Sequence, residues 1–126
     1  METIKSYTDI EQSRKLAKIL PLESANMYYD RGGLPSLIDK YVTHESIKND
    51  KYYHLIPCWS LSALLNILPK NLNIGRPSLN SNYKGYYWIQ YYDEFMKPNN
   101  YKTECFNNPV DACVAMVEKL NELNLL

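Results

Sequence analysis

The sequence lacks a net charge and lacks any long apolar run. Its 14 Lys and Arg residues balance 14 Asp and Glu residues, so no summed field steers the protein towards nucleic acid or an anionic membrane surface. The apolar run at residues 61–68 is far shorter than the roughly 20 residues of a membrane span, and residues 1–6 contain no apolar targeting segment. These absences predict a cytoplasmic protein without a membrane partner, and nucleic acid is its least favoured partner.

The sequence also has few residues that build a reactive centre. Its three cysteines are Cys58, Cys105 and Cys113, an odd number without close spacing, which argues against a disulfide framework and fits a reducing compartment. The gaps between His44, His54 and Cys58 match no zinc pattern. The four glycines are too few and too scattered for a phosphate-binding loop. We therefore expect no metal and no cofactor.

The most apolar stretch, residues 56–69, predicts a short buried helix. Ser60 is its expected N-cap, because a serine hydroxyl accepts a hydrogen bond from a free backbone N–H of the first turn. Pro69 ends the helix. One face carries four leucines at helical spacing, which are expected in the core: Leu61, Leu64, Leu65 and Leu68.

The first helix is predicted from a capping box at Thr8 and Glu11 and runs to about residue 20. Pro21 follows and cannot continue it.

The last helix has three agreeing signals at its start. Asn108 is an N-cap residue, Pro109 fits the first helical position, and Asp111 complements the positive end of the helix dipole. Its apolar face is expected to contain Cys113, Met116, Val117, Leu120 and Leu123.

Several short strands are predicted between these helices. Residues 27–29 favour a strand, which a turn at Gly32 and Gly33 closes. Residues 37–42 fit either a partner strand or a helical turn, and residues 44–50 are polar and predict a loop. Residues 52–56 are expected to form a strand that leads into the central helix.

The second half of the chain predicts an antiparallel meander. Residues 78–82 and 86–92 form the arms of a hairpin, residues 97–100 the next turn, and residues 101–106 the next strand. The expected fold is a single globular α+β domain over residues 1–126, with a small antiparallel sheet and about three helices packed mainly on one face.

Cys58 is the most reactive candidate, because a thiol at the start of a helix has its thiolate stabilised by the helix dipole. The glycine-rich signature of thiol proteases is missing, however, and no histidine follows Cys58. The alternative is a small buried residue that packs under the helix. We therefore predict no catalytic residue, and a small thiol-dependent enzyme is the second hypothesis.

The twelve tyrosines are more than a core of this size needs. In the strand at residues 86–92, side chains alternate between two faces, and both faces are aromatic. If helices cover one face, the other exposes rings that suit a protein partner or a second copy of the chain. The predicted partner-binding residues are Tyr86, Trp88 and Tyr92. Alternatively, loops cover these rings or they stack across strands.

Several segments resemble a group of small uncharacterised proteins of gut bacteria and their prophages. The likeness lies in the Ile-Pro-Cys-Trp-Ser-Leu run at residues 56–61, the Met-Tyr-Tyr segment at residues 27–29, and the Asn-Pro-Val-Asp-Ala start of the last helix. It leaves out the hairpin and residues 31–53. The resemblance implies a cytoplasmic or phage-associated setting and supplies no activity. The function we expect is a non-enzymatic accessory or protein-binding domain that uses the aromatic sheet face.

Overall fold

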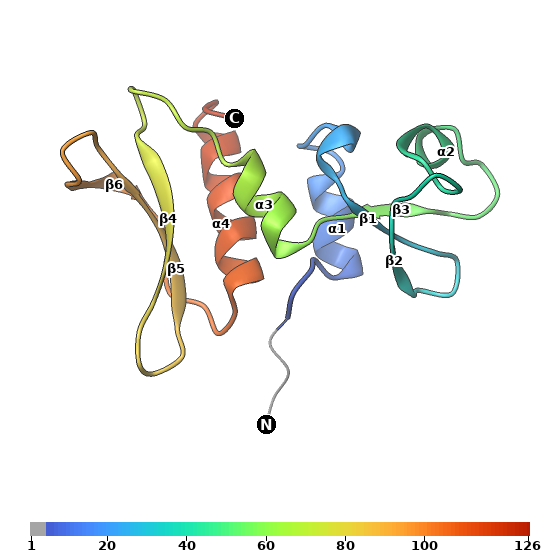
Figure 1. The fold of residues 1–126 in the computed structure, drawn as a ribbon, viewed down its shortest axis with the longest axis horizontal. Helices are drawn as coiled ribbons and strands as arrows, with labels where there is room; N and C mark the ends of the chain where they lie inside the picture. The colour runs from blue at the N-terminus through green and yellow to red at the C-terminus, as the bar shows by residue number, and fades with distance from the viewer. Residues whose placement is uncertain (1–4) are drawn as a thin grey trace. The chain divides into compact units, whose positions relative to one another are not determined.

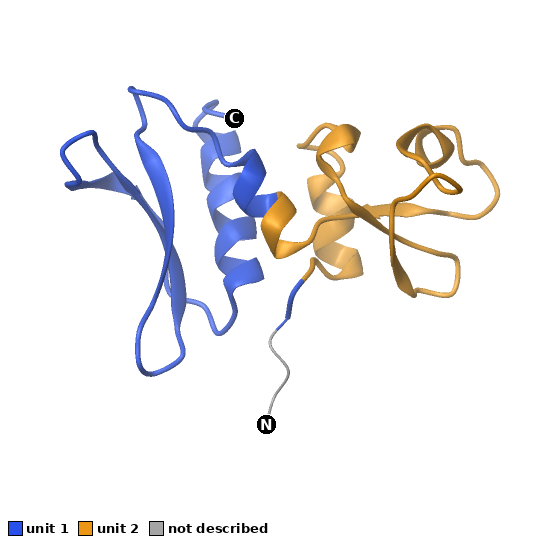
Figure 2. Cartoon of the chain, viewed as in Figure 1, with its two compact units in different colours: residues 1–6, 64–126 blue, residues 7–63 orange. Residues whose placement is uncertain are grey.

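The computed structural model describes residues 5–126 (Figure 1) and divides the chain into two compact units (Figure 2). Unit 1 comprises residues 5–6 and 64–126, and unit 2 is Tyr7–Ala63. Each unit contains helices and a three-stranded antiparallel sheet, so the α+β prediction is confirmed. The single domain stays a prediction, and the expected lack of a targeting segment falls mostly on residues 1–4, which lie outside the described residues. No helix among residues 5–126 has the length and apolarity to cross a membrane.

The first helix of unit 2, α1 (Ile10–Leu16), is shorter than expected and is capped by a different residue. Asp9, not Thr8, is the N-cap: its carboxylate accepts from the Gln12 N–H at 2.7 Å, and the Gln12 side chain accepts from the Asp9 N–H. Thr8 is buried, and its hydroxyl oxygen accepts from the backbone N–H of Trp59 at 3.2 Å. The capping box therefore starts one residue later than predicted. A short 3-10 helix, η1 (Leu22–Ser24), follows.

The loop predicted at residues 44–50 is wrong, because α2 (His44–Lys48) occupies it. Thr43 caps this helix by accepting from the Ser46 N–H, and the Ser46 hydroxyl accepts from the Thr43 N–H. Ile47 is the buried residue of the helix. A single apolar residue gives no periodicity, so hydrophobic spacing could not reveal α2.

The sheet of unit 2 has the order β2-β1-β3, from β1 (Met27–Tyr29), β2 (Pro35–Leu37) and β3 (Ile56–Cys58). The strand at residues 27–29 is confirmed, and its turn contains Gly33 with a φ of 80°. Residues 38–42 belong to neither a strand nor a helix, and the strand expected at residues 52–56 instead starts at Ile56.

Helix α3 (Leu61–Ile67) spans the boundary between the units and starts where predicted. The Ser60 hydroxyl accepts from the Ala63 N–H at 3.2 Å, which confirms the N-cap. Leu64 and Leu68 are buried, while Leu61 and Leu65 are half-buried.

The sheet of unit 1 is the predicted meander, with the order β4-β5-β6. Its strands are β4 (Arg76–Ser81), β5 (Tyr87–Tyr92) and β6 (Pro98–Lys102). The last turn lies earlier than expected: the Asp93 carboxylate accepts from the N–H groups of Phe95 and Lys97, and β6 begins at Pro98. Proline is tolerated there because it is the first residue of an edge strand.

Helix α4 (Pro109–Glu122) packs on β5 and covers one face of this sheet (Figure 1). Asn108 caps it as predicted, accepting from the Asp111 N–H at 2.9 Å. Four of the five predicted apolar positions are fully buried: Cys113, Met116, Val117 and Leu120. Leu123 is exposed, because the helix ends before it.

Candidate functional site

The outer face of the β4-β5-β6 sheet, opposite α4, carries the predicted aromatic residues. Ile89 and Tyr91 are fully buried on the inner face, so the alternation along β5 places Trp88 and Tyr92 on the outer face. None of the helices described in unit 1 lies on this side (Figure 1). We define the outer face by its residues on the paired strands, which are Arg76, Ser78, Asn80, Trp88, Gln90 and Tyr92.

The three predicted rings do not share one environment. Trp88 and Tyr92 lie on β5 and are half-buried, opposite Asn80 and Arg76 of β4. Tyr86 precedes the strand, in the turn that joins β4 to β5, and its side chain is 42% exposed. The strand therefore presents two rings on the outer face, and the turn presents a third.

Gln90 separates the two rings and fixes this part of the sheet. Although it lies on the outer face, it is buried. Its amide donates to the backbone oxygens of Tyr91 at 2.7 Å and Asn99 at 2.8 Å, where the pairing of β5 with β6 shifts in register. The amide bonds to backbone carbonyls of both strands at the place where their pairing is irregular. Trp88 and Tyr92 thus lie on either side of Gln90, whose side chain is held by hydrogen bonds to the backbone.

The edges of both sheets are protected against strand addition. Each edge strand contains one proline, namely Pro35 in β2, Pro57 in β3, Pro77 in β4 and Pro98 in β6. The central strands β1 and β5 contain none. Proline lacks the N–H that an added strand would need and is a common guard of edge strands. A partner is thus better accommodated on a sheet face than along an edge.

Cys58 is fully buried at the end of β3, and its thiol lies against the start of α1. The sulfur donates to the Thr8 carbonyl at 3.4 Å, and the Thr8 hydroxyl lies 3.5 Å from it. Burial raises the pKa of the Cys58 thiol, which disfavours the thiolate that a nucleophile requires. His44 binds the Ala25 carbonyl at 2.6 Å and His54 is exposed, whereas the sulfur of Cys58 contacts groups of Thr8. The geometry gives no support to a thiol-dependent enzyme.

Alkylation distinguishes the three thiols. We expect iodoacetamide to modify only Cys105 in the native protein, because Cys105 is exposed while Cys58 and Cys113 are buried. Denaturant should make all three cysteines reactive, as measured by intact mass. Rapid native modification of Cys58 would contradict its structural role.

No family model, no curated protein and no solved structure matches this chain. The resemblance to small proteins of gut bacteria and prophages therefore stays a prediction. Among residues 5–126, no group of three or more His, Cys, Asp or Glu side chains is arranged to hold a metal ion.

The most exposed rings of unit 2 were not identified from the sequence. Tyr41, Tyr52 and Tyr53 lie in the segments that flank α2, and their side chains are 78%, 78% and 64% exposed. Their segments have no periodicity, so hydrophobic spacing gave no reason to select them. The signal that could have found them is an Asp placed two or three residues before each tyrosine, since Asp often caps a turn.

Proposed function

We propose that this chain is a non-enzymatic binding domain whose outer face contacts a protein partner through Trp88 and Tyr92, with Tyr86 at the margin. The observation that carries the proposal is that two large rings are half-exposed on a sheet face opposite α4. Tyr and Trp are favoured at interfaces because they supply a large contact area for little lost side-chain entropy. A cytoplasmic setting also belongs to the proposal and rests on the three unpaired cysteines and the absence of an apolar targeting segment in residues 1–6, whereas the phage association rests on the resemblance alone.

The size of the outer face limits the strength of this contact. Three strands about 4.8 Å apart, each about six residues long at about 3.3 Å per residue, cover roughly 300 Å². A stable interface buries about 800 Å² per partner. Contact through this face alone should therefore be weak and transient, unless the partner also reaches Tyr86 and the neighbouring turn.

A triple substitution tests the proposal with a second copy of the chain as the first partner. Wild-type protein is expected to self-associate at high concentration in sedimentation equilibrium, whereas the Tyr86→Ser/Trp88→Ser/Tyr92→Ser variant stays monomeric and folded. Tyr41→Ser is the matched control, because it removes an exposed ring from unit 2. If the triple variant unfolds, the rings belong to the core and the proposal fails.

Tryptophan fluorescence gives an independent readout. Trp59 is fully buried, whereas Trp88 is half-buried, so acrylamide should quench mainly Trp88. A partner that covers the outer face is expected to protect Trp88 from quenching in wild-type protein. Quenching that does not change while the partner is bound would place the contact elsewhere.

A further inference from the structure

The two rings on the outer face of unit 1 form one continuous surface. In the register of β4 and β5, Asn80 lies opposite Trp88, four residues away from Tyr92. Four residues span about 13 Å along a strand. The Asn80 amide nevertheless donates to the Tyr92 hydroxyl oxygen at 3.4 Å, so the Tyr92 ring lies along the sheet and points towards Trp88. Gln90, which lies between the two rings, is accordingly buried.

These rings also present hydrogen-bond donors. The Tyr92 oxygen accepts from Asn80, so its own O–H proton remains to be donated. No group among residues 5–126 accepts from the Trp88 Nε1–H, and every buried side-chain nitrogen and oxygen there has a partner, so this N–H is open to solvent. Arg76, opposite Tyr92, and Lys102, opposite Gln90, add charged donors. The outer face therefore offers aromatic rings beside donors.

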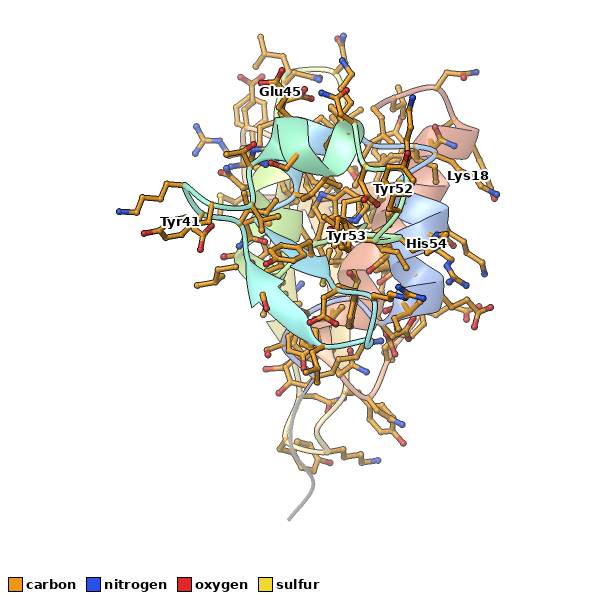
Figure 3. All side chains as sticks on the ribbon, turned by 90° about the vertical axis from the view of Figure 1, so that its right-hand side faces the viewer. Lys18, Tyr41, Glu45, Tyr52, Tyr53 and His54 are labelled. Carbon is orange, nitrogen blue, oxygen red and sulfur yellow. The ribbon has the colours of Figure 1, made fainter. Side chains whose placement is uncertain are left out.

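The exposed tyrosines of unit 2 offer no comparable surface. Figure 3 shows Tyr41 at the opposite edge of the view from Tyr52 and His54. Asp39 holds the backbone of the first loop and Asp50 that of the second, and no hydrogen bond between described residues joins the two loops. We therefore look for a specific partner at the outer face.

Three features limit how a protein partner can lie on the outer face. Pro77 in β4 and Pro98 in β6 disfavour the addition of a strand at either edge. An amphipathic helix needs an apolar groove, whereas four of the six residues that define the face are polar. The face covers roughly 300 Å², too little for two folded surfaces that meet in a stable complex. A short extended segment satisfies all three limits.

A proline-rich segment has the chemistry that complements this face. In the polyproline II conformation the backbone has no internal hydrogen bonds, so its carbonyls are free to accept, and proline has no N–H to donate. Such segments dock on aromatic-lined surfaces, and their conformation is formed before binding. At about 3.1 Å per residue, the span of about 13 Å from Trp88 to Tyr92 accommodates about four residues, slightly more than one turn.

We propose that the outer face binds a proline-rich segment in the polyproline II conformation. The proline rings pack on Trp88 and Tyr92, while the carbonyls accept from the Trp88 Nε1–H and the Tyr92 O–H. This inference rests on the proposed function of the face and adds the class of its partner. Because the segment is already extended, binding orders little, and a contact of this small size can form.

Fluorescence anisotropy of fluorescein-labelled decaproline with the full chain tests this proposal. Wild-type protein is expected to bind decaproline and not a glycine-serine peptide of the same length. Trp88→Ala should weaken binding roughly tenfold or more, because a tryptophan at the centre of a small interface is its main anchor. Tyr83→Ala is the matched control, since its ring is 94% exposed in the turn between β4 and β5 and its loss should leave binding unchanged.

Two conservative variants separate the rings from their donors. Tyr92→Phe keeps the ring and removes the O–H, so binding should weaken by roughly two- to tenfold, the effect of one hydrogen bond. Trp88→Phe likewise keeps a ring and removes the Nε1–H. If Trp88→Ala loses the circular dichroism spectrum of the folded protein, Trp88→Phe takes its place and must still weaken binding.

The outcomes that overturn the proposal are distinct from a failure of the proposed function. Absence of decaproline binding by wild-type protein overturns it, as does equal binding of the glycine-serine peptide or an equal loss in Tyr83→Ala. Stronger competition by oligo(dT) than by unlabelled decaproline overturns it in favour of nucleic acid. If wild-type protein self-associates through the outer face but does not bind decaproline, the proposed function stands and this class of partner is wrong.

Discussion

Replacing Gly75 by alanine is expected to lower the free energy of unfolding by about 2–4 kcal/mol. Gly75 has a φ of +87°, which costs an alanine about 1–2 kcal/mol. A Cβ at this position would also overlap the carbonyl oxygen of Tyr92 and lie 2.9 Å from its carbonyl carbon. Both atoms belong to the backbone of β5, so the overlap cannot be relieved by a side-chain rotation.

The matched control is Gly85→Ala in the turn between β4 and β5. Gly85 has nearly the same φ, +85°, but nothing lies within 4 Å of the added Cβ. Its substitution by alanine should therefore lower the free energy of unfolding by only about 1–2 kcal/mol, which is the cost of the positive φ. Urea denaturation followed by fluorescence measures both variants. Equal losses would show that the close approach to Tyr92 contributes nothing to the Gly75 effect.

Helix starts could be predicted where the capping residue acts only within its own turn. Ser60 and Asn108 each bond an N–H three residues later, and both were identified from the sequence. At the first helix two neighbouring residues, Thr8 and Asp9, are both good caps. Tertiary structure decides between them, because the Thr8 oxygen is needed by Trp59, which lies 51 residues further along the chain.

The elements of residues 31–55 were mostly missed because they are short and polar. β2 has three residues and pairs with β1 through contacts that no periodicity reveals, and α2 buries only Ile47. In unit 1, the Pro-Asn-Asn sequence after Lys97 is a strong turn signal. The turn is nevertheless made earlier, by Asp93, and Met96 adopts a φ of 63° in it. Because methionine rarely adopts a positive φ, the sequence does not indicate a turn at this residue.

At the outer face, the alternation of side chains along a strand was sufficient to place Tyr91 on the opposite face from Trp88 and Tyr92. It could not show that Gln90 turns its amide onto the backbone of β6, since that contact follows from the register shift. Nor could composition show where the excess tyrosines lie. The most exposed one, Tyr83, lies in the turn between β4 and β5, the next most exposed lie in loops that Asp39 and Asp50 cap, and Tyr29 and Tyr91 are buried core residues.

Raising the pH above about 9 is expected to destabilise the protein, because several buried acids resist ionisation in the folded state. Burial raises the pKa of Cys113 from 9.0 to about 12, and burial likewise raises the pKa values of Cys58, Tyr29 and Tyr91. The unfolded chain releases these protons at lower pH than the native protein does. The stability contributed by Cys113 is thus complete below pH 9 and is lost as the pH rises towards 12.

The expected slope is a loss of up to about 1.4 kcal/mol per pH unit for each such group, measured by urea denaturation at several pH values between those limits. Cys113→Ala should lower the free energy of unfolding at neutral pH, because it leaves a small cavity. It should also make the loss of stability with rising pH less steep, because it removes one group whose pKa is raised by folding. Cys105→Ala is the control, since Cys105 is exposed and its removal should leave the slope unchanged. An alkaline slope that is identical in Cys113→Ala and wild-type protein would mean that this thiol ionises equally in both states, which its complete burial on the inner side of α4 argues against.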